Sequence, residues 1–122
     1  MPALSFKKQF ATMVESGKKH QTIRKTRKRP IKVGDKLYLY TGMRTKSCRK
    51  LGEAVCKSAE NIEIFNTDLF YFPNVIVGCI RLSVEETSKI IRDDGFEFEK
   101  DFYDFFMDES GRLRFKGQLI KW

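Results

Sequence analysis

The stretch Gly17–Arg24 carries the side chains best suited to chemistry, because it places Lys19, Thr22 and Arg24 close together. A threonine hydroxyl becomes a nucleophile when a neighbouring base removes its proton, and a partly desolvated lysine with a lowered pKa can be that base. Cations such as Lys18 and Arg24 lower a lysine pKa further by like-charge repulsion. The stretch predicts either a ligand-contacting or catalytic lysine and threonine or, in the plainest interpretation, a solvated lysine beside a strand threonine.

Two elements are expected to position these side chains. Apolar residues recur at helical spacing and predict a helix over about residues 7–16, with Ser5 as N-cap and Gly17 at its end. The apolar stripe consists of Phe6, Phe10, Met13 and Val14. A strand follows, and alternation along it turns Thr22 and Arg24 to the same face.

Positive charge is concentrated in the first half of the chain. Residues 1–57 carry 16 basic and 3 acidic side chains, whereas residues 58–122 carry 8 and 13, within a net charge of +8. This asymmetry favours a basic face that binds a polyanion, and nucleic acid is the leading class of partner. Two clusters are predicted to contact phosphates on one rim, although charge runs are also typical of solvated loops. They are Lys25, Arg27, Lys28 and Arg29, and Arg44, Lys46, Arg49 and Lys50.

Several classes of protein are disfavoured. The chain has 122 residues, which predicts one domain over residues 1–122. Three widely spaced cysteines make a poor disulfide framework, and without an export signal they indicate the reducing cytoplasm, with each cysteine a small buried apolar residue. One histidine and no Cys-x-x-Cys pair predict no metal site, and no cofactor is expected. The apolar stretches are too short to span a membrane.

The rest of the chain predicts strands followed by helices, an α+β class with a small barrel. The expected strands cover residues 36–41, 53–57, 62–65, 75–82 and the segment after Gly111, where Gly117 is a candidate bulge. A capping box at Ser83 predicts a helix to about Asp93 that Gly95 ends. An aromatic stripe of expected core residues predicts a second helix: Phe98, Phe102, Phe105 and Phe106. Candidates for base stacking are Tyr38, Tyr40, Phe70, Tyr71 and Phe72.

These motifs together resemble the ASCH family. The resemblance rests on a Gly-x-Lys-x-x-Thr-x-Arg run, a Val-Gly-Asp turn before a strand and an Asp-Gly-Phe run before an aromatic helix. In this chain they are Gly17, Lys19, Thr22 and Arg24, then Val33–Asp35, then Asp94–Phe96 with Phe105 and Phe106. The matching pieces span nearly the whole sequence. The resemblance implies a PUA-like β-barrel with an N-terminal helix and two short helices near the C-terminus.

The resemblance also implies a function and a set of site residues. It implies binding of RNA or a modified nucleoside in a basic cleft, by Gly17, Lys18, Lys19, Thr22 and Arg24. Some similar proteins are amidohydrolases that deacetylate N(4)-acetylcytidine, and others are described as ribonucleases. The amidohydrolase alternative implies catalysis by Lys19, Thr22 and an acid at Asp94, with neighbouring Asp93 as second choice. A third hypothesis is a protein-interaction module whose basic face meets an acidic partner.

Overall fold

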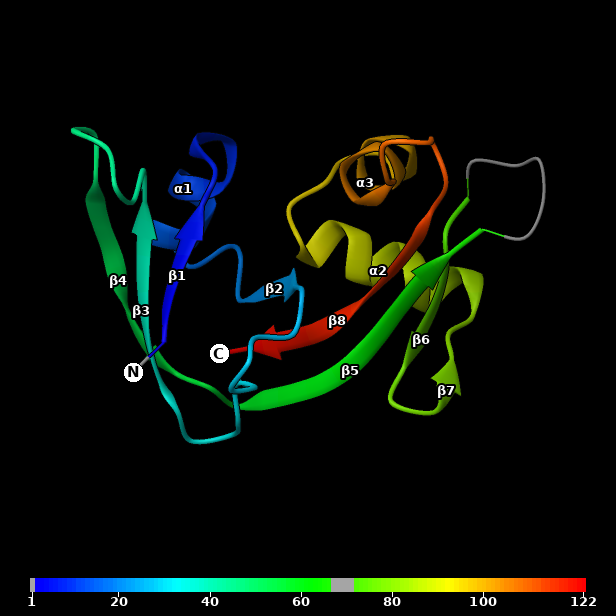
Figure 1. Cartoon of the computed structure of the whole chain (residues 1–122), viewed down its shortest axis with the longest axis horizontal. Helices are drawn as coiled ribbons and strands as arrows, with labels where there is room; N and C mark the ends of the chain where they lie inside the picture. Colours follow the sequence, from blue (N-terminus) through cyan, green and yellow to red (C-terminus); the bar gives the residue numbers. More distant parts are fainter. Residues whose placement is uncertain (1, 67–71) are drawn as a thin grey trace.

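The computed structural model describes residues 2–66 and 72–122, which form eight strands and three helices (Figure 1). The elements, in chain order, are β1 (Ala3–Phe6), α1 (Lys8–Glu15), β2 (Gln21–Arg24), β3 (Lys36–Thr41), β4 (Arg49–Val55), β5 (Ser58–Phe65), β6 (Asn74–Val77), β7 (Ile80–Arg81), α2 (Val84–Asp93), α3 (Glu99–Phe106) and β8 (Arg114–Lys121). One helix lies near the N-terminus, strands dominate the rest of the first two-thirds, and two helices lie in the last third, so the predicted α+β composition fits the observed elements.

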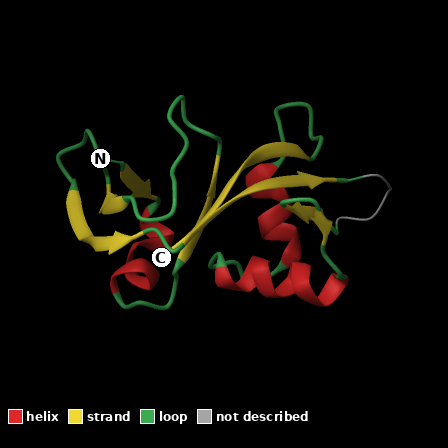
Figure 2. Cartoon of the chain, turned by 90° about the horizontal axis from the view of Figure 1, so that it is seen from below, coloured by secondary structure: helices red, strands yellow, loops and turns green. Residues whose placement is uncertain are grey.

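The strands form two sheets. β1, β3 and β4 make a three-stranded sheet in that order, with β1 parallel to β3. The second sheet has the order β2-β8-β5-β6-β7 and is antiparallel throughout. In Figure 2 the two sheets lie side by side along the molecule, with α2 and α3 against the five-stranded one.

The predicted closed barrel is wrong. Within the described residues no strand pairing joins the two sheets, so their edges do not close. The chain turns between β4 and β5, where the Cys56 N–H donates to Asp35 O and the Lys57 N–H donates to Lys121 O, both at 2.8 Å. Before this turn β4 pairs with β3, and after it β5 pairs with β8, so the turn carries the chain from one sheet to the other. Alternating hydrophobicity predicts which face of a strand is buried, and it does not specify which strands pair.

The N-terminus differs from its prediction. The sequence predicted Ser5 as a helix N-cap, but Ser5 lies in β1 opposite Tyr40 of β3. Lys7 precedes α1 instead and makes no side-chain capping bond. The strand forms because Leu4 and Phe6 alternate into the core while the intervening backbone pairs with β3. The helix itself is confirmed, and Gly17 ends it with φ +81.

The C-terminal helices follow their sequence signals more closely. Ser83 Oγ accepts from the Glu86 N–H at 3.1 Å and Glu86 Oε1 accepts from the Ser83 N–H at 3.0 Å, which confirms the capping box. Phe102 and Phe106 are buried as predicted, but Phe98 and Phe105 are 59% and 40% exposed, so the expected core stripe is only half correct. No described helix has both the length and the apolarity needed to cross a membrane.

The core lies between the sheets and the helices. Its fully buried members include Leu4, Leu37, Ile62, Ile64, Ile91, Phe102 and Ile120. Cys56 is buried, whereas Cys48 and Cys79 are exposed free thiols, contrary to the expectation for those two. The bulge predicted at Gly117 is also wrong, because the β5–β8 register runs through it without a shift. A Cβ there would lie 2.1 Å from Arg24 O, so glycine permits the close approach of β2 to β8.

Candidate functional site

A buried ion pair joins two residues that are 75 positions apart in the sequence. Lys19 Nζ lies 3.0 Å from Asp94 Oδ1, and the two side chains are 3% and 5% exposed. Lys19 also donates to the backbone carbonyl of Asp94. Gln21 Nε2 lies 3.4 Å from the same carboxylate oxygen and donates to Ile90 O at 3.1 Å. The lysine and the carboxylate therefore fix each other's position.

Two helix ends position this pair. After α1, the backbone N–H groups of Lys18 and Lys19 both donate to Met13 O at 2.9 Å, which turns the chain toward β2. At the end of α2, the Asp94 N–H donates to Ile90 O at 2.9 Å, and Gly95 follows with φ +99. A left-handed glycine ends each helix, so each charged residue is fixed beside a rigid element.

The ion pair borders a cavity of about 230 Å³ between β1, α1, β2 and α3. The lining residues are Ser5, Phe6, Lys7, Phe10, Lys19, Thr22, Ile23, Arg24, Asp94 and Phe105. The structure thus brings together Lys19, Thr22, Arg24 and Asp94, four of the six residues predicted for ligand contact or catalysis. Their grouping depends on the pairing of β2 with β8 and on the packing of α2 and α3 above it (Figure 1).

Thr22 and Arg24 share a face of β2, as alternation predicted. Arg24 Nε donates to Thr22 Oγ1 at 3.1 Å, and its guanidinium also donates to Ser5 O. The guanidinium carbon lies 4.8 Å from the centre of the Phe6 ring. The bond from Arg24 occupies a lone pair of the threonine oxygen and leaves the hydroxyl proton free to donate. The ammonium of Lys19 donates to Asp94 rather than to Thr22.

Burial dominates the electrostatics of the cavity. It lowers the pKa of Lys19, an effect that the Asp94 carboxylate opposes and Arg24 reinforces. Burial likewise raises the pKa of Asp94, against the pull of Lys19. Arg24 has its pKa lowered to about 10 by burial and by neighbouring Arg27. The predicted lowering of the Lys19 pKa is confirmed in direction, with desolvation as the first cause and like-charge repulsion as a smaller one.

Other predicted residues lie outside the cavity. Gly17 and Lys18 are exposed, and Lys18 lines a separate hollow of about 370 Å³ beside His20 and Trp122. Among the stacking candidates, Tyr38 and Tyr40 are half-buried on β3, and Phe72 is half-buried before β6. Phe70 and Tyr71 lie outside the described residues.

The two predicted phosphate-binding clusters lie at opposite ends of β3 rather than on one rim (Figure 1). In the first cluster, Lys25 and Arg27 line a hollow of about 530 Å³ that shares Ile23, Arg24 and Phe105 with the cavity. Arg27, Lys28 and Arg29 line a further hollow of about 660 Å³.

The second cluster is divided among different environments. Arg44 and Lys46 are exposed in the turn between β3 and β4. Arg49 forms an ion pair with Glu15, and Lys50 pairs with Glu53 at 2.6 Å. Arg49 is the one member that lines a groove next to the cavity.

Sequence reasoning missed Lys7 and Phe105 as lining residues. Lys7 Nζ lies 4.7 Å from the centre of the Phe105 ring, so together they cover one side of the cavity. The available signal was the adjacent pair Lys7 and Lys8 directly after an apolar residue, outside both recognised clusters. The stripe that contains Phe105 suggested core packing instead.

Comparisons of the chain with protein-family models, with curated proteins and with solved structures gave no match. The resemblance to the ASCH family therefore stays a hypothesis based on the residues quoted for it. What the site can do follows from its own chemistry: a buried cation, a carboxylate, a hydroxyl and a guanidinium around one small cavity.

Proposed function

We propose that this protein binds RNA or a nucleoside and accepts one base in the cavity between Lys19, Thr22, Arg24 and Asp94. One observation carries the proposal: three side chains of residues 19–24 and the distant Asp94 line a single cavity closed on one side by an aromatic ring. Bases are recognised by hydrogen bonds to their edges and by stacking on aromatic or guanidinium planes. In this cavity the Thr22 hydroxyl and the Asp94 carboxylate would hydrogen-bond to a base edge. Phe105 and Arg24 would stack on the base.

The size of the cavity supports a single base. Its volume of about 230 Å³ lies below the roughly 300–1,000 Å³ of pockets that hold drug-sized ligands. Larger cofactors would extend beyond it. The resemblance to the ASCH family, with its expected RNA or nucleoside ligands, agrees with a site of this kind.

Salt dependence distinguishes the two forms of ligand. Each phosphate neutralised on a single strand contributes a slope of about −0.7 in a plot of log affinity against log salt. Fluorescence anisotropy with a short single-stranded RNA, and calorimetry with free nucleosides, should be run from 50 to about 300 mM salt. A steep slope with RNA supports a polymer, and salt-insensitive nucleoside binding supports the base site alone. Binding of neither ligand contradicts the proposal.

Two conservative variants test the cavity itself. Arg24→Met removes a charged hydrogen-bonding group worth about 1.5–3 kcal/mol, so we expect RNA affinity to fall about 10- to 100-fold. Thr22→Val removes one hydroxyl while keeping its shape, and the expected loss is about 3- to 10-fold. Lys89→Ala on α2, whose partner is Asp93, is the control. Affinities equal to the control for both folded variants would contradict a role for the cavity.

A second candidate function is deacetylation of N(4)-acetylcytidine. It is favoured by the placement of Thr22 in one cavity with a lysine whose pKa burial lowers. In this scheme neutral Lys19 takes the Thr22 proton as the Thr22 oxygen attacks the acetyl carbonyl, the cytosine amine leaves with that proton, and water then hydrolyses the acetyl ester. The reaction releases cytidine and acetate and restores the threonine.

Absorbance of N(4)-acetylcytidine during incubation with the protein tests this candidate. Turnover should disappear in Lys19→Ala and in Thr22→Val, while contacts of the basic loops with RNA remain. Turnover that survives in both variants would contradict the mechanism. The absence of turnover in the unaltered protein leaves binding as the function.

A further inference from the structure

A wide groove adjoins the cavity on the side of β1 and α1. Its volume is about 670 Å³, against about 230 Å³ for the cavity, and both are lined by Ser5, Phe6 and Lys7. The segment Ser5–Lys7 is therefore the boundary that the two hollows share. The groove is large enough for a neighbouring nucleotide.

The groove has the chemistry of a phosphate-binding surface. Lys7, Lys8 and Arg49 line it, and none of its lining residues in the described part of the chain is acidic. Arg49 forms an ion pair with Glu15 of α1, so a phosphate bound there would compete with that carboxylate for the guanidinium. Thr12 and Ser47 add exposed hydroxyl groups. Lysine, arginine, serine and threonine are among the side chains that contact nucleic-acid phosphates. The groove thus combines positive charge with neutral hydrogen-bonding groups.

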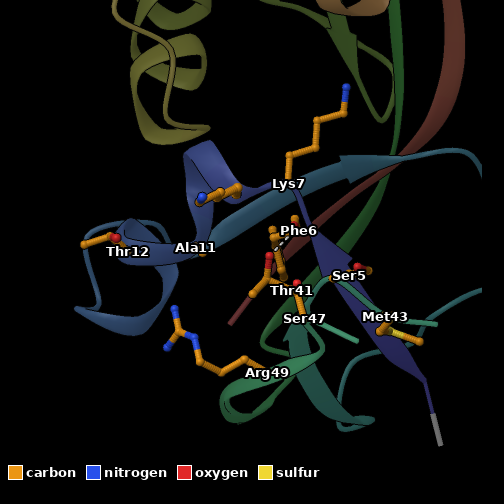
Figure 3. Close-up of a pocket in the computed structure, with 11 residues that line it drawn as sticks. Ser5, Phe6, Lys7, Ala11, Thr12, Thr41, Met43, Ser47 and Arg49 are labelled. Carbon is orange, nitrogen blue, oxygen red and sulfur yellow. Dashed lines mark hydrogen bonds between the residues drawn. The ribbon is translucent and has the colours of Figure 1, made fainter. Parts of the chain in front are cut away.

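The cations come from separate elements, and they line both the groove and its junction with the cavity. Figure 3 shows Arg49 extending from β4 toward α1, where Thr12 lies, while Lys7 extends in another direction. Lys7 Nζ lies over the ring of Phe105, at the cavity. Thr41 Oγ1 donates to Phe6 O at 2.8 Å and ties β3 to the segment that the groove and the cavity share.

We propose that this groove holds the sugar–phosphate backbone of the same RNA strand whose base occupies the cavity, with Lys8 and Arg49 contacting phosphates. The inference rests on the proposed function and adds a direction to it: the strand leaves the cavity past Phe6 and Lys7 toward α1 and β4. Neither Lys7 nor Lys8 belongs to the basic clusters of the sequence prediction, which placed its cations in the loops that flank β3.

A matched pair of double variants tests the groove. Lys8→Ala/Arg49→Ala removes two groove cations from exposed positions. Lys89→Ala/Lys100→Ala removes two exposed cations from α2 and α3, away from both the groove and the cavity. Anisotropy with a five-nucleotide single-stranded RNA should give a salt slope smaller by about 1.4 in the groove variant and unchanged in the control. Free-nucleoside affinity should be the same in both, and circular dichroism checks folding.

The outcomes separate this inference from the function on which it rests. A groove variant with the slope and RNA affinity of the control, in a protein that still loses RNA binding through Arg24→Met, overturns the groove and keeps the base site. RNA binding that is insensitive to Arg24→Met, together with no nucleoside binding, overturns the proposed function and with it the groove inference. A reduced slope with unchanged nucleoside affinity supports both.

Discussion

Two clusters of acidic and basic side chains in this protein have similar N···O distances, but their pKa values are shifted in opposite directions. Lys19 and Asp94 are buried at 3.0 Å, while exposed Glu53 lies 2.9 Å from Lys36 and 2.6 Å from Lys50. In the buried pair, the pKa of the lysine is lowered and that of the acid is raised. In the exposed cluster, the lysine pKa values are raised and that of Glu53 is lowered to about 2. Burial, rather than the distance between charges, decides the direction.

The contrast separates a candidate functional pair, Lys19 and Asp94, from an ordinary surface cluster around Glu53. Water solvates both signs of charge around Glu53, so its ion pairs form at little cost and contribute little. Removing Lys19 and Asp94 from water is costly, and their attraction compensates only because hydrogen bonds satisfy them. A buried charged pair that lines a cavity is therefore a better candidate for a functional site than an exposed pair.

The largest expected effect comes from breaking the buried pair. Asp94→Ala leaves Lys19 buried without its carboxylate, and we expect a loss of about 3–5 kcal/mol in the free energy of unfolding at pH 7, measured with urea. The pKa of Lys19 in the folded state falls further below 10.5, so the unfolded state binds more protons between the two pKa values and stability rises as the pH increases toward 10.5. Asp93→Ala, at the exposed neighbour, is the control. Equal losses in the two variants would contradict the contrast.

Replacing both partners should restore much of that loss. Lys19→Met/Asp94→Leu removes both buried charges and fills the space with apolar side chains, a change that is often neutral or stabilising. We expect the double variant to lie at least about 2 kcal/mol above Asp94→Ala in urea unfolding, with ligand binding abolished. Additive losses from the two single substitutions would show that the two charges are not energetically coupled.

A smaller effect is expected from the helix that positions Asp94. Ser83→Ala removes the hydroxyl that caps α2 and costs about 0.5–2 kcal/mol. Because α2 ends at the ion pair, RNA affinity should fall modestly together with stability. Urea unfolding and anisotropy on the same preparation measure both. An unchanged unfolding midpoint would contradict the contribution of the capping box.

The smallest effect is expected at the exposed cluster. Glu53→Gln should leave the thermal midpoint at pH 7 nearly unchanged, and added salt should remove what difference there is. Any stabilisation by the ionised Glu53 is present above pH 4.5 and is lost as the pH falls through about 2, because its folded-state pKa is the lower one. Calorimetric scans of both proteins should therefore converge toward pH 2. A shift as large as that of Asp94→Ala would invalidate the comparison.

Local signals in the sequence predicted part of the cavity lining better than they predicted the strand pairing. Alternation placed Thr22 and Arg24 on one face, and the lowered pKa of Lys19 was anticipated in direction. Asp94 entered through a family resemblance, since no local pattern links residues 19 and 94. Closure of a barrel was expected because strand periodicity does not identify neighbouring strands. β1 was missed because its four residues gain their structure from parallel pairing with β3.

Partly exposed aromatic residues were the other source of error. A helical stripe predicts the face that turns inward, but it does not say how far the neighbouring elements cover it. Phe102 packs fully, while Phe105, three residues later, borders the cavity. A glycine inside a strand is typical of a bulge or of a close backbone approach. At Gly117 the close approach is to Arg24 O, and the sequence does not show it because the two strands are nearly 100 residues apart.

The central place of β8 has a consequence for the growing chain. β8 pairs with both β2 and β5, and within the described residues it is the sole partner of β2. During synthesis, β2, which carries Thr22 and Arg24, therefore has no strand to pair with until residues 114–121 have been made. At about 5–20 residues per second this delay lasts roughly 5–20 s. The cavity is thus completed only after residues 114–121 have been translated, and nascent chains without β8 carry the positive charge but no formed cavity.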